Sequence, residues 1–148
     1  MSNGSVRLAA GSLVLELSPS IGGAISNFQR VDGGRPTPIL RACNSPLQNV
    51  LDAASFPLVP FVNRIRGGCF AFRGRQVRLA PNMAGDPSPL HGQGWLSAWD
   101  VERAGADSAT LRFEHAADEW PWAYAARQRV ELEAGGVSIR VTSRNRGA

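Results

Sequence analysis

The chain has no lysine, and its 148 residues include only two histidines, two cysteines and one tyrosine. Two cysteines cannot build a disulfide framework, and Cys43 and Cys69 do not have metal-ligand spacing. We therefore expect two free, partly buried thiols in a reducing compartment and no metal site. No apolar run is long enough to span a bilayer, and the N-terminus lacks the basic-then-apolar order of a signal peptide. These absences favour a cytoplasmic protein with no membrane partner.

Positive charge comes from arginine alone, since all 16 basic residues are arginines. They are scattered from Arg7 to Arg146, and they form no basic block. A net charge of +4 raises the question of an acidic partner. Nucleic-acid binding usually concentrates basic residues on one face, beside aromatic residues or a recognisable module. Neither feature is present, so we expect no nucleic-acid partner.

The apolar residues recur with period two, and helical periodicity is nearly absent. The alternation is clearest in residues 13–17, 110–114, 124–133 and 137–142. Residues 70–79 are typical of a hairpin with Phe70 and Phe72 turned inward. The pattern predicts an all-β protein of antiparallel strands. Because such sheets must cover an apolar face and protect their edges, we expect a β-sandwich, and the chain length makes one domain the default.

Two stretches, residues 32–64 and 80–94, are too rich in proline, glycine, asparagine and aspartate to read as strands. Loops of this length in a compact β-domain are usually functional or disordered. The first ends with Asn63 and Arg64, and the second contains His91. Between two apolar residues, Arg64 is either a buried structural fork or a binder of polyhydroxyl ligands. No Walker-type phosphate loop or Gly-x-Ser-x-Gly motif occurs, so nucleophilic hydrolysis is not indicated.

The two histidines receive different interpretations from their neighbours in the sequence. His91 precedes Gly92 and Gly94, whose missing Cβ atoms would let a ligand approach the backbone. Imidazole exchanges protons near neutral pH, so His91 is either a ligand-facing group or a hydrogen-bonded structural histidine. We place His115 on the polar side of the alternation at residues 110–114, and we expect it to be solvated.

Three strings occur in order: FPLVPFVNRIRGGCFAFRGRQVRLAPN, PLHGQGWLSAWDV and WPWAYAARQRVEL. Together they resemble the N-terminal half of the aldose 1-epimerase, or galactose mutarotase, family. The similarity runs from about Leu15, through Gly22 and Gly23, to the end of the chain. It implies the galactose mutarotase-like supersandwich, a large antiparallel β-sandwich with a sugar site on a concave face. It also implies a small aldose as partner and no metal or organic cofactor.

The resemblance implies that the α and β anomers of a free hexose, such as galactose or glucose, are interconverted. In this family a carboxylate base takes the proton of the C1 hydroxyl, a histidine protonates the ring oxygen, and the ring opens and recloses. Arg64 matches the arginine that binds sugar hydroxyls, and His91 matches the catalytic-site histidine near the ring oxygen. Asn63 matches a neighbouring position that shapes the pocket. Trp95 and Trp99 follow the motif, and we expect both to pack in the core.

The resemblance makes residues 1–148 the N-terminal portion of one mutarotase-like domain. The family's second histidine, its principal acid, has no match here, nor do its later sugar-binding aspartate and its glutamate base. Glu114, Asp118 and Glu119 are expected to be solvated. We therefore expect these residues alone to be inactive and to self-associate through unpaired strands. Two alternatives stay open: a carbohydrate-binding remnant, and a sugar-phosphate epimerase with two or more converging arginines.

Overall fold

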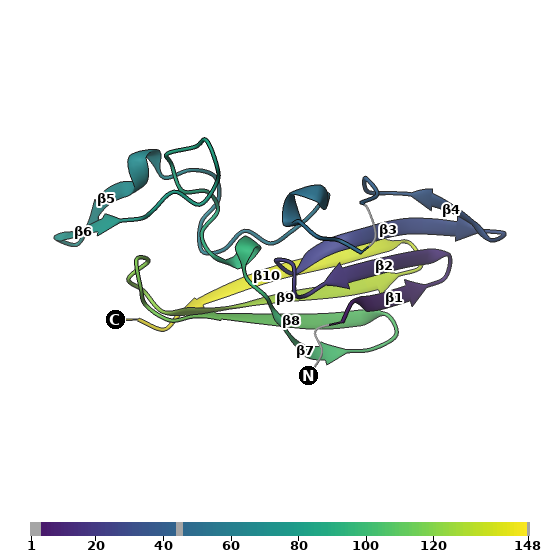
Figure 1. The fold of residues 1–148 in the computed structure, drawn as a ribbon. Helices are drawn as coiled ribbons and strands as arrows, with labels where there is room; N and C mark the ends of the chain where they lie inside the picture. Colours follow the sequence, from purple (N-terminus) through teal and green to yellow (C-terminus); the bar gives the residue numbers. More distant parts are fainter. Residues whose placement is uncertain (1–3, 44–45, 148) are drawn as a thin grey trace.

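The protein's computed structural model describes residues 4–43 and 46–147, which form two four-stranded antiparallel sheets and one separate hairpin (Figure 1). The first sheet has the order β1-β2-β3-β4, with β1 (Val6–Ala10), β2 (Leu13–Ser18), β3 (Ala24–Asp32) and β4 (Arg35–Pro38). The second has the order β10-β9-β8-β7, with β7 (Asp100–Ala104), β8 (Ser108–His115), β9 (Tyr124–Glu133) and β10 (Gly136–Asn145). The hairpin consists of β5 (Cys69–Phe72) and β6 (Arg75–Arg78).

Three short 3-10 helices, η1 (Val50–Asp52), η2 (Arg66–Gly68) and η3 (Gly94–Leu96), lie between the strands. Within the described residues there is no helix long and apolar enough to cross a membrane.

The core lies between the two sheets, as the alternation predicts. Figure 1 shows the first sheet lying over the second. Leu15 and Leu17 of β2 and Leu111 of β8 are completely buried there. Burying such a side chain contributes about 1.5–3 kcal/mol. The buried Gln128 of β9 donates its Nε2 hydrogen to Gly23 O at 2.8 Å, which ties the second sheet to the turn that precedes β3. The predicted antiparallel β-sandwich is therefore confirmed.

Two details of the strand prediction are wrong. The stretch at residues 32–64 contains β4, a short and fully exposed strand whose two prolines resemble loop composition. The β5–β6 hairpin forms where the sequence predicts it, but Phe72 is 48% exposed instead of inward. The reason is that the hairpin projects from one end of the molecule (Figure 1), where Phe72 packs edge-on against the ring of Trp122 instead of entering the core.

His115 is also placed wrongly by the sequence interpretation, because it is buried. Residues 111, 113 and 115 share one face of β8, so the imidazole joins Leu111 and Phe113 on the core side. Its Nε2 lies 3.3 Å from Trp120 O and 3.1 Å from Asp118 Oδ1. A polar partner on the 118–120 turn thus lets this histidine be buried.

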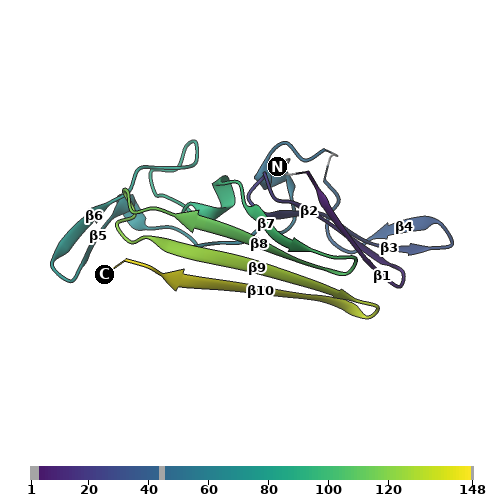
Figure 2. The same ribbon diagram turned by 90° about the horizontal axis from the view of Figure 1, so that it is seen from below.

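Strand β10 forms one edge of the second sheet, as Figure 2 shows. Its Ile139 and Val141 are 43% and 42% exposed, although Ile139 pairs with the fully buried Val130 of β9. An apolar, unpaired edge is where chains associate. Self-association through this strand stays a prediction.

A second apolar cluster lies beneath the loops and supports the candidate site. It joins Ala24 of β3 to Val50 of η1 and to Leu90 and Trp95, which lie on either side of His91 in the sequence. Trp95 is only 2% exposed, and its ring stacks on Phe56 with centroids 5.9 Å apart. The prediction that Trp95 and Trp99 pack in the core is confirmed, since Trp99 is fully buried.

Candidate functional site

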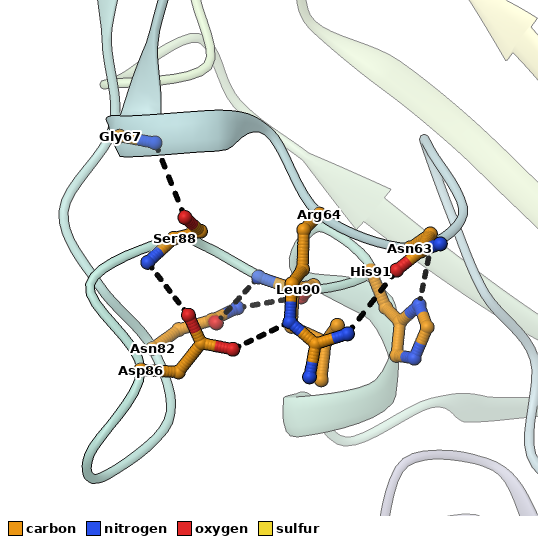
Figure 3. A network of polar contacts seen from close by, with 8 residues as sticks. All are labelled: Asn63, Arg64, Gly67, Asn82, Asp86, Ser88, Leu90 and His91. Carbon is orange, nitrogen blue, oxygen red and sulfur yellow. Dashed lines mark hydrogen bonds and ion pairs between the residues drawn. The ribbon is translucent and has the colours of Figure 1, made fainter.

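The two long loops predicted from the sequence, residues 32–64 and 80–94, meet where they carry Asn63, Arg64 and His91, and bring these three residues together (Figure 3). Arg64 and Leu90 form an isolated antiparallel bridge. On one side of it Ile65 N donates to Pro89 O at 3.1 Å, and on the other His91 N donates to Asn63 O at 3.0 Å. Main-chain hydrogen bonds therefore fix the position of His91 relative to Asn63 and Arg64, although it lies 28 and 27 positions from them along the chain.

Asn63 and His91 are joined by two hydrogen bonds. The main-chain oxygen of Asn63 accepts from His91 N, and the main-chain N–H of Asn63 donates to His91 Nδ1 at 2.9 Å. Both residues adopt the left-handed conformation, with φ of 66° and 59°. Asparagine and histidine are both enriched among the few non-glycine residues in this region, and residues held there cluster at functional sites.

The Asn63 contact decides which nitrogen of His91 carries the proton. Because a main-chain N–H can only donate, Nδ1 must be the acceptor, and the neutral imidazole has its hydrogen on Nε2. No described residue hydrogen-bonds to Nε2, which lies on the ring's far side from Asn63 (Figure 3). His91 therefore presents one N–H donor to whatever occupies the site.

The pKa of His91 is lowered from its usual 6.5, first by burial and second by the charge of Arg64. Protonation of Nδ1 would also bring its hydrogen against the hydrogen of the Asn63 N–H, and this repulsion lowers the pKa of His91 further. His91 is therefore neutral at pH 7, as a hydrogen-bond donor and not as an imidazolium acid.

Two side chains hold the main chain on both sides of His91. Asn82 Oδ1 accepts from Leu90 N at 2.7 Å, and its Nδ2 donates to Leu90 O at 2.7 Å. Trp95 Nε1 donates to both Leu90 O at 3.0 Å and Gly92 O at 3.1 Å. The indole also meets the imidazole of His91 edge-on, with centroids 5.9 Å apart. These contacts leave the His91 ring little freedom to turn.

Arg64 is fixed by a carboxylate. Its Nε donates to Asp86 Oδ2 at 2.5 Å, and its Nη1 donates to Asn63 Oδ1 at 3.3 Å. The pKa of Asp86 is held below its ordinary value of 3.8, chiefly by the hydrogen bond from Arg64 and then by that from Ser88 N. Of the two interpretations left open for Arg64, the buried fork does not hold, because its side chain is 52% exposed.

The glycines after His91 serve packing instead of ligand approach, which corrects the interpretation from sequence. A Cβ on Gly92 would lie 2.2 Å from Pro60 Cδ, and one on Gly94 would lie 2.4 Å from Val59 Cγ2. The space that these glycines leave is thus filled by the 59–60 segment of the protein itself.

Within the described residues, Asp86 is the acidic residue that pairs with Arg64, and no carboxylate hydrogen-bonds to His91. Three further carboxylates, those of Glu114, Asp118 and Glu119, are exposed, as expected. Each nevertheless has a partner in the protein. Glu114 pairs with Arg112 and Arg146, Asp118 accepts a hydrogen bond from Trp120 N, and Glu119 accepts one from Ala80 N. Over residues 4–43 and 46–147, no three His, Cys, Asp or Glu side chains could jointly hold a metal ion. Cys43 is half-buried and Cys69 exposed, and both are free thiols.

Sequence reasoning missed Asn82, Asp86 and the role of the Trp95 indole. Asn82 and Asp86 lie in the 80–94 loop, and in the sequence only the length and composition of this loop indicate a functional segment. Their partners are 8 and 22 positions away in the chain, a separation at which no local pattern exists.

Solved structures with the same architecture come from several organisms. A candidate aldose 1-epimerase of Escherichia coli K12 matches with a TM-score of 0.86 and 36% identity, over 98% of this chain and 47% of its own. The GalM/aldose epimerase homologue of C. elegans matches with a TM-score of 0.81, over 99% of this chain and 47% of its own, at an 18% identity that shows the fold alone. The fold and the paired loops thus define a galactose mutarotase-like β-sandwich protein.

Sequence comparison narrows this class to a family. The aldose 1-epimerase family model matches residues 5–148. The uncharacterized protein YphB of Escherichia coli K12 is 37% identical over 141 residues, which cover 95% of this chain and 46% of YphB. The chain therefore belongs to the aldose 1-epimerase family. It spans about half the length of the curated relatives and solved structures that it matches.

Proposed function

We propose that this chain supplies one side of the sugar site of an aldose 1-epimerase-type isomerase. The reaction is the interconversion of the α and β anomers of a free hexose of the galactose or glucose class. The observation that carries the proposal is the fixed tautomer of His91, whose Nε2–H is free to donate beside the unpaired edge of Arg64.

Ring opening needs the ring oxygen to be stabilised as the bond from C1 breaks. A neutral imidazole N–H can donate a hydrogen bond to this oxygen and stabilise the negative charge that develops on it. His91 is suited to this role, and less suited to giving up a proton, because a neutral imidazole is a very weak acid. Arg64 offers its free Nη hydrogens to sugar hydroxyls, which fixes the pyranose against His91. Asn63 is assigned the supporting role of holding both.

Proton removal at the C1 hydroxyl needs a carboxylate base. Asp86 does not fit this role, because it is paired with Arg64 and its lowered pKa makes it a weak base. The proposal therefore includes a base, and a proton-donating acid, from outside the described residues. The second candidate function, sugar binding without catalysis, is favoured by the same observation.

The experiment follows the optical rotation of freshly dissolved α-D-galactose and α-D-glucose with residues 1–148 alone and with a chain completed to the length of the family relatives, called the full-length protein below. The full-length protein should equilibrate the anomers faster than buffer, whereas residues 1–148 alone should not. Arg64→Ala should lower kcat/KM about ten- to hundredfold, since it removes charge-assisted hydrogen bonds to the sugar. Arg66→Ala, at an exposed arginine on η2, is the matched control and should change little.

The outcomes separate the two functions. A full-length protein that binds the sugars by NMR titration but leaves their rotation at the buffer rate has the second function. Equal losses in both arginine variants would contradict the assignment of Arg64 to the sugar.

A further inference from the structure

Asp86 is the more enclosed partner of the Arg64 ion pair. Its side chain is 20% exposed, against 52% for Arg64. Its second oxygen, Oδ1, accepts from Ser88 N at 2.9 Å, and Ser88 Oγ in turn accepts from Gly67 N at 3.1 Å (Figure 3). Both carboxylate oxygens are thus committed, and the carboxylate is held in place as the acceptor to which Arg64 is attached.

The attachment leaves a defined part of the guanidinium for a ligand. Asp86 takes the Nε hydrogen and Asn63 takes one Nη1 hydrogen at 3.3 Å. Nη2 has no hydrogen bond to any described residue, as its bare nitrogen in Figure 3 shows. The Nη edge points away from Asp86 and toward the side of the loops where His91 lies.

The pair is also electrically balanced. Arg64 is the charged residue that shifts the pKa of both Asp86 and His91, and His91 itself is neutral. A phosphate recognised here would need arginines that converge with open forks. It would instead meet one arginine whose charge is already offset by a carboxylate in contact with it. A sugar hydroxyl carries no charge and is not repelled by that carboxylate.

We propose that Asp86 is a positioning and specificity-determining residue, which holds Arg64 through Nε and offsets its charge so that the site accepts an uncharged aldose in preference to a phosphorylated one. This proposal rests on the proposed sugar site, and it selects the free hexose over the sugar phosphate as substrate class. Asp86 acts through Arg64 and does not touch the sugar itself.

The test uses Asp86→Asn in the full-length protein, because the amide keeps the size of the side chain and an acceptor for Ser88 N. The KM and kcat for α-D-glucose are measured by polarimetry, together with the inhibition constants of inorganic phosphate and glucose 6-phosphate. We expect KM for glucose to rise up to about fivefold and kcat to stay within about twofold. The inhibition constants of both phosphates should fall about five- to tenfold, because an uncompensated arginine attracts anions.

Three comparisons make the result specific. Glu102→Gln removes the carboxylate of the exposed Glu102–Arg127 pair on the second sheet, and should leave all these constants within about twofold. Asp86→Glu keeps the charge and should restore wild-type phosphate inhibition. In an Arg64→Ala background, Asp86→Asn should have no further effect on the sugar.

Unchanged phosphate inhibition in Asp86→Asn, or the same gain in Glu102→Gln, would overturn the proposal for Asp86. A wild-type protein that neither binds glucose nor accelerates its mutarotation would instead overturn the proposed function. Calorimetric titration with inorganic phosphate then decides the role of Asp86 by itself: tighter binding to Asp86→Asn than to wild type supports it, and equal binding rejects it.

Discussion

Replacing Gly92 with alanine tests how the loop that carries His91 is held. Gly92 has φ of +72°, and a Cβ there would lie 2.2 Å from Pro60 Cδ and 2.6 Å from Val59 O. One neighbour belongs to a proline ring and the other to the main chain, so neither can turn aside as a flexible side chain would. Accommodating the methyl group requires the two segments to separate, and His91 must move with its neighbour.

Gly85 provides a matched control in the same loop. Its φ is +78°, but a Cβ there would meet nothing within 4 Å. Gly85→Ala therefore reports the left-handed conformation alone, which costs about 1–2 kcal/mol. Gly92→Ala adds the cost of overpacking, about 1–3 kcal/mol. The reduced entropy of the unfolded chain is common to both variants, so it cancels in the comparison.

The assay is urea unfolding of the full-length protein, followed by tryptophan fluorescence. With a slope of about 1–3 kcal/mol per molar urea, the midpoint of Gly92→Ala should lie about 1 M below that of Gly85→Ala. Mutarotation should fall in Gly92→Ala and persist in Gly85→Ala. Equal midpoints for the two variants would refute the reasoning, since they would mean that the 59–60 segment yields without cost.

Three further predictions concern the histidines and Asn82. His91→Asn should lower kcat about a hundredfold or more, because the Nε2–H donor is lost. His115→Asn should lower the free energy of unfolding by about 1–3 kcal/mol and leave kcat within about twofold. Equal losses of kcat in the two variants would mean that both substitutions act on folding. Because folding lowers the pKa of His91 from 6.5, its stabilising contribution is complete above pH 6.5 and is lost as the pH falls through the lower, folded-state pKa. NMR titration of the ring should give a midpoint below 6.5, and a midpoint at or above it contradicts the Asn63 contact. Asn82→Ala should speed hydrogen exchange of the Leu90 amide and cost about 1–3 kcal/mol, and an unchanged amide would show that the main chain holds itself.

The sequence predicted the strands that bury one face. Tyr124 to Leu132 alternate strictly, and every second residue of this run is buried. The exposed β4 was missed because Arg35–Pro38 buries nothing, so hydrophobic periodicity has no signal there. The prediction for His115 is wrong because it follows the polarity of the side chain and not its position on the same strand face as Leu111 and Phe113. Burial of a polar group depends on a hydrogen-bond partner, here Trp120 O, that only the folded chain supplies.

The site was predicted in part. Asn63, Arg64 and His91 come together as the motifs indicated, while their roles stay proposals. The positions of Asp86 and Asn82 could not be read from the sequence, because ion pairs and side-chain to main-chain bonds between two loops leave no periodic trace. The tautomer of His91 likewise depends on one contact across 28 positions.

The hydrogen bond that orients His91 comes from the main chain of Asn63 and not from its side chain. Nineteen of the twenty amino acids carry this donor, and proline alone lacks it. Substitution at this position is therefore limited by the backbone conformation, with φ of 66°, and by the weaker side-chain contact to Arg64. Glycine at position 63 would keep the imidazole in place, so the orientation of the ring is largely insulated from point mutation of the residue that provides it.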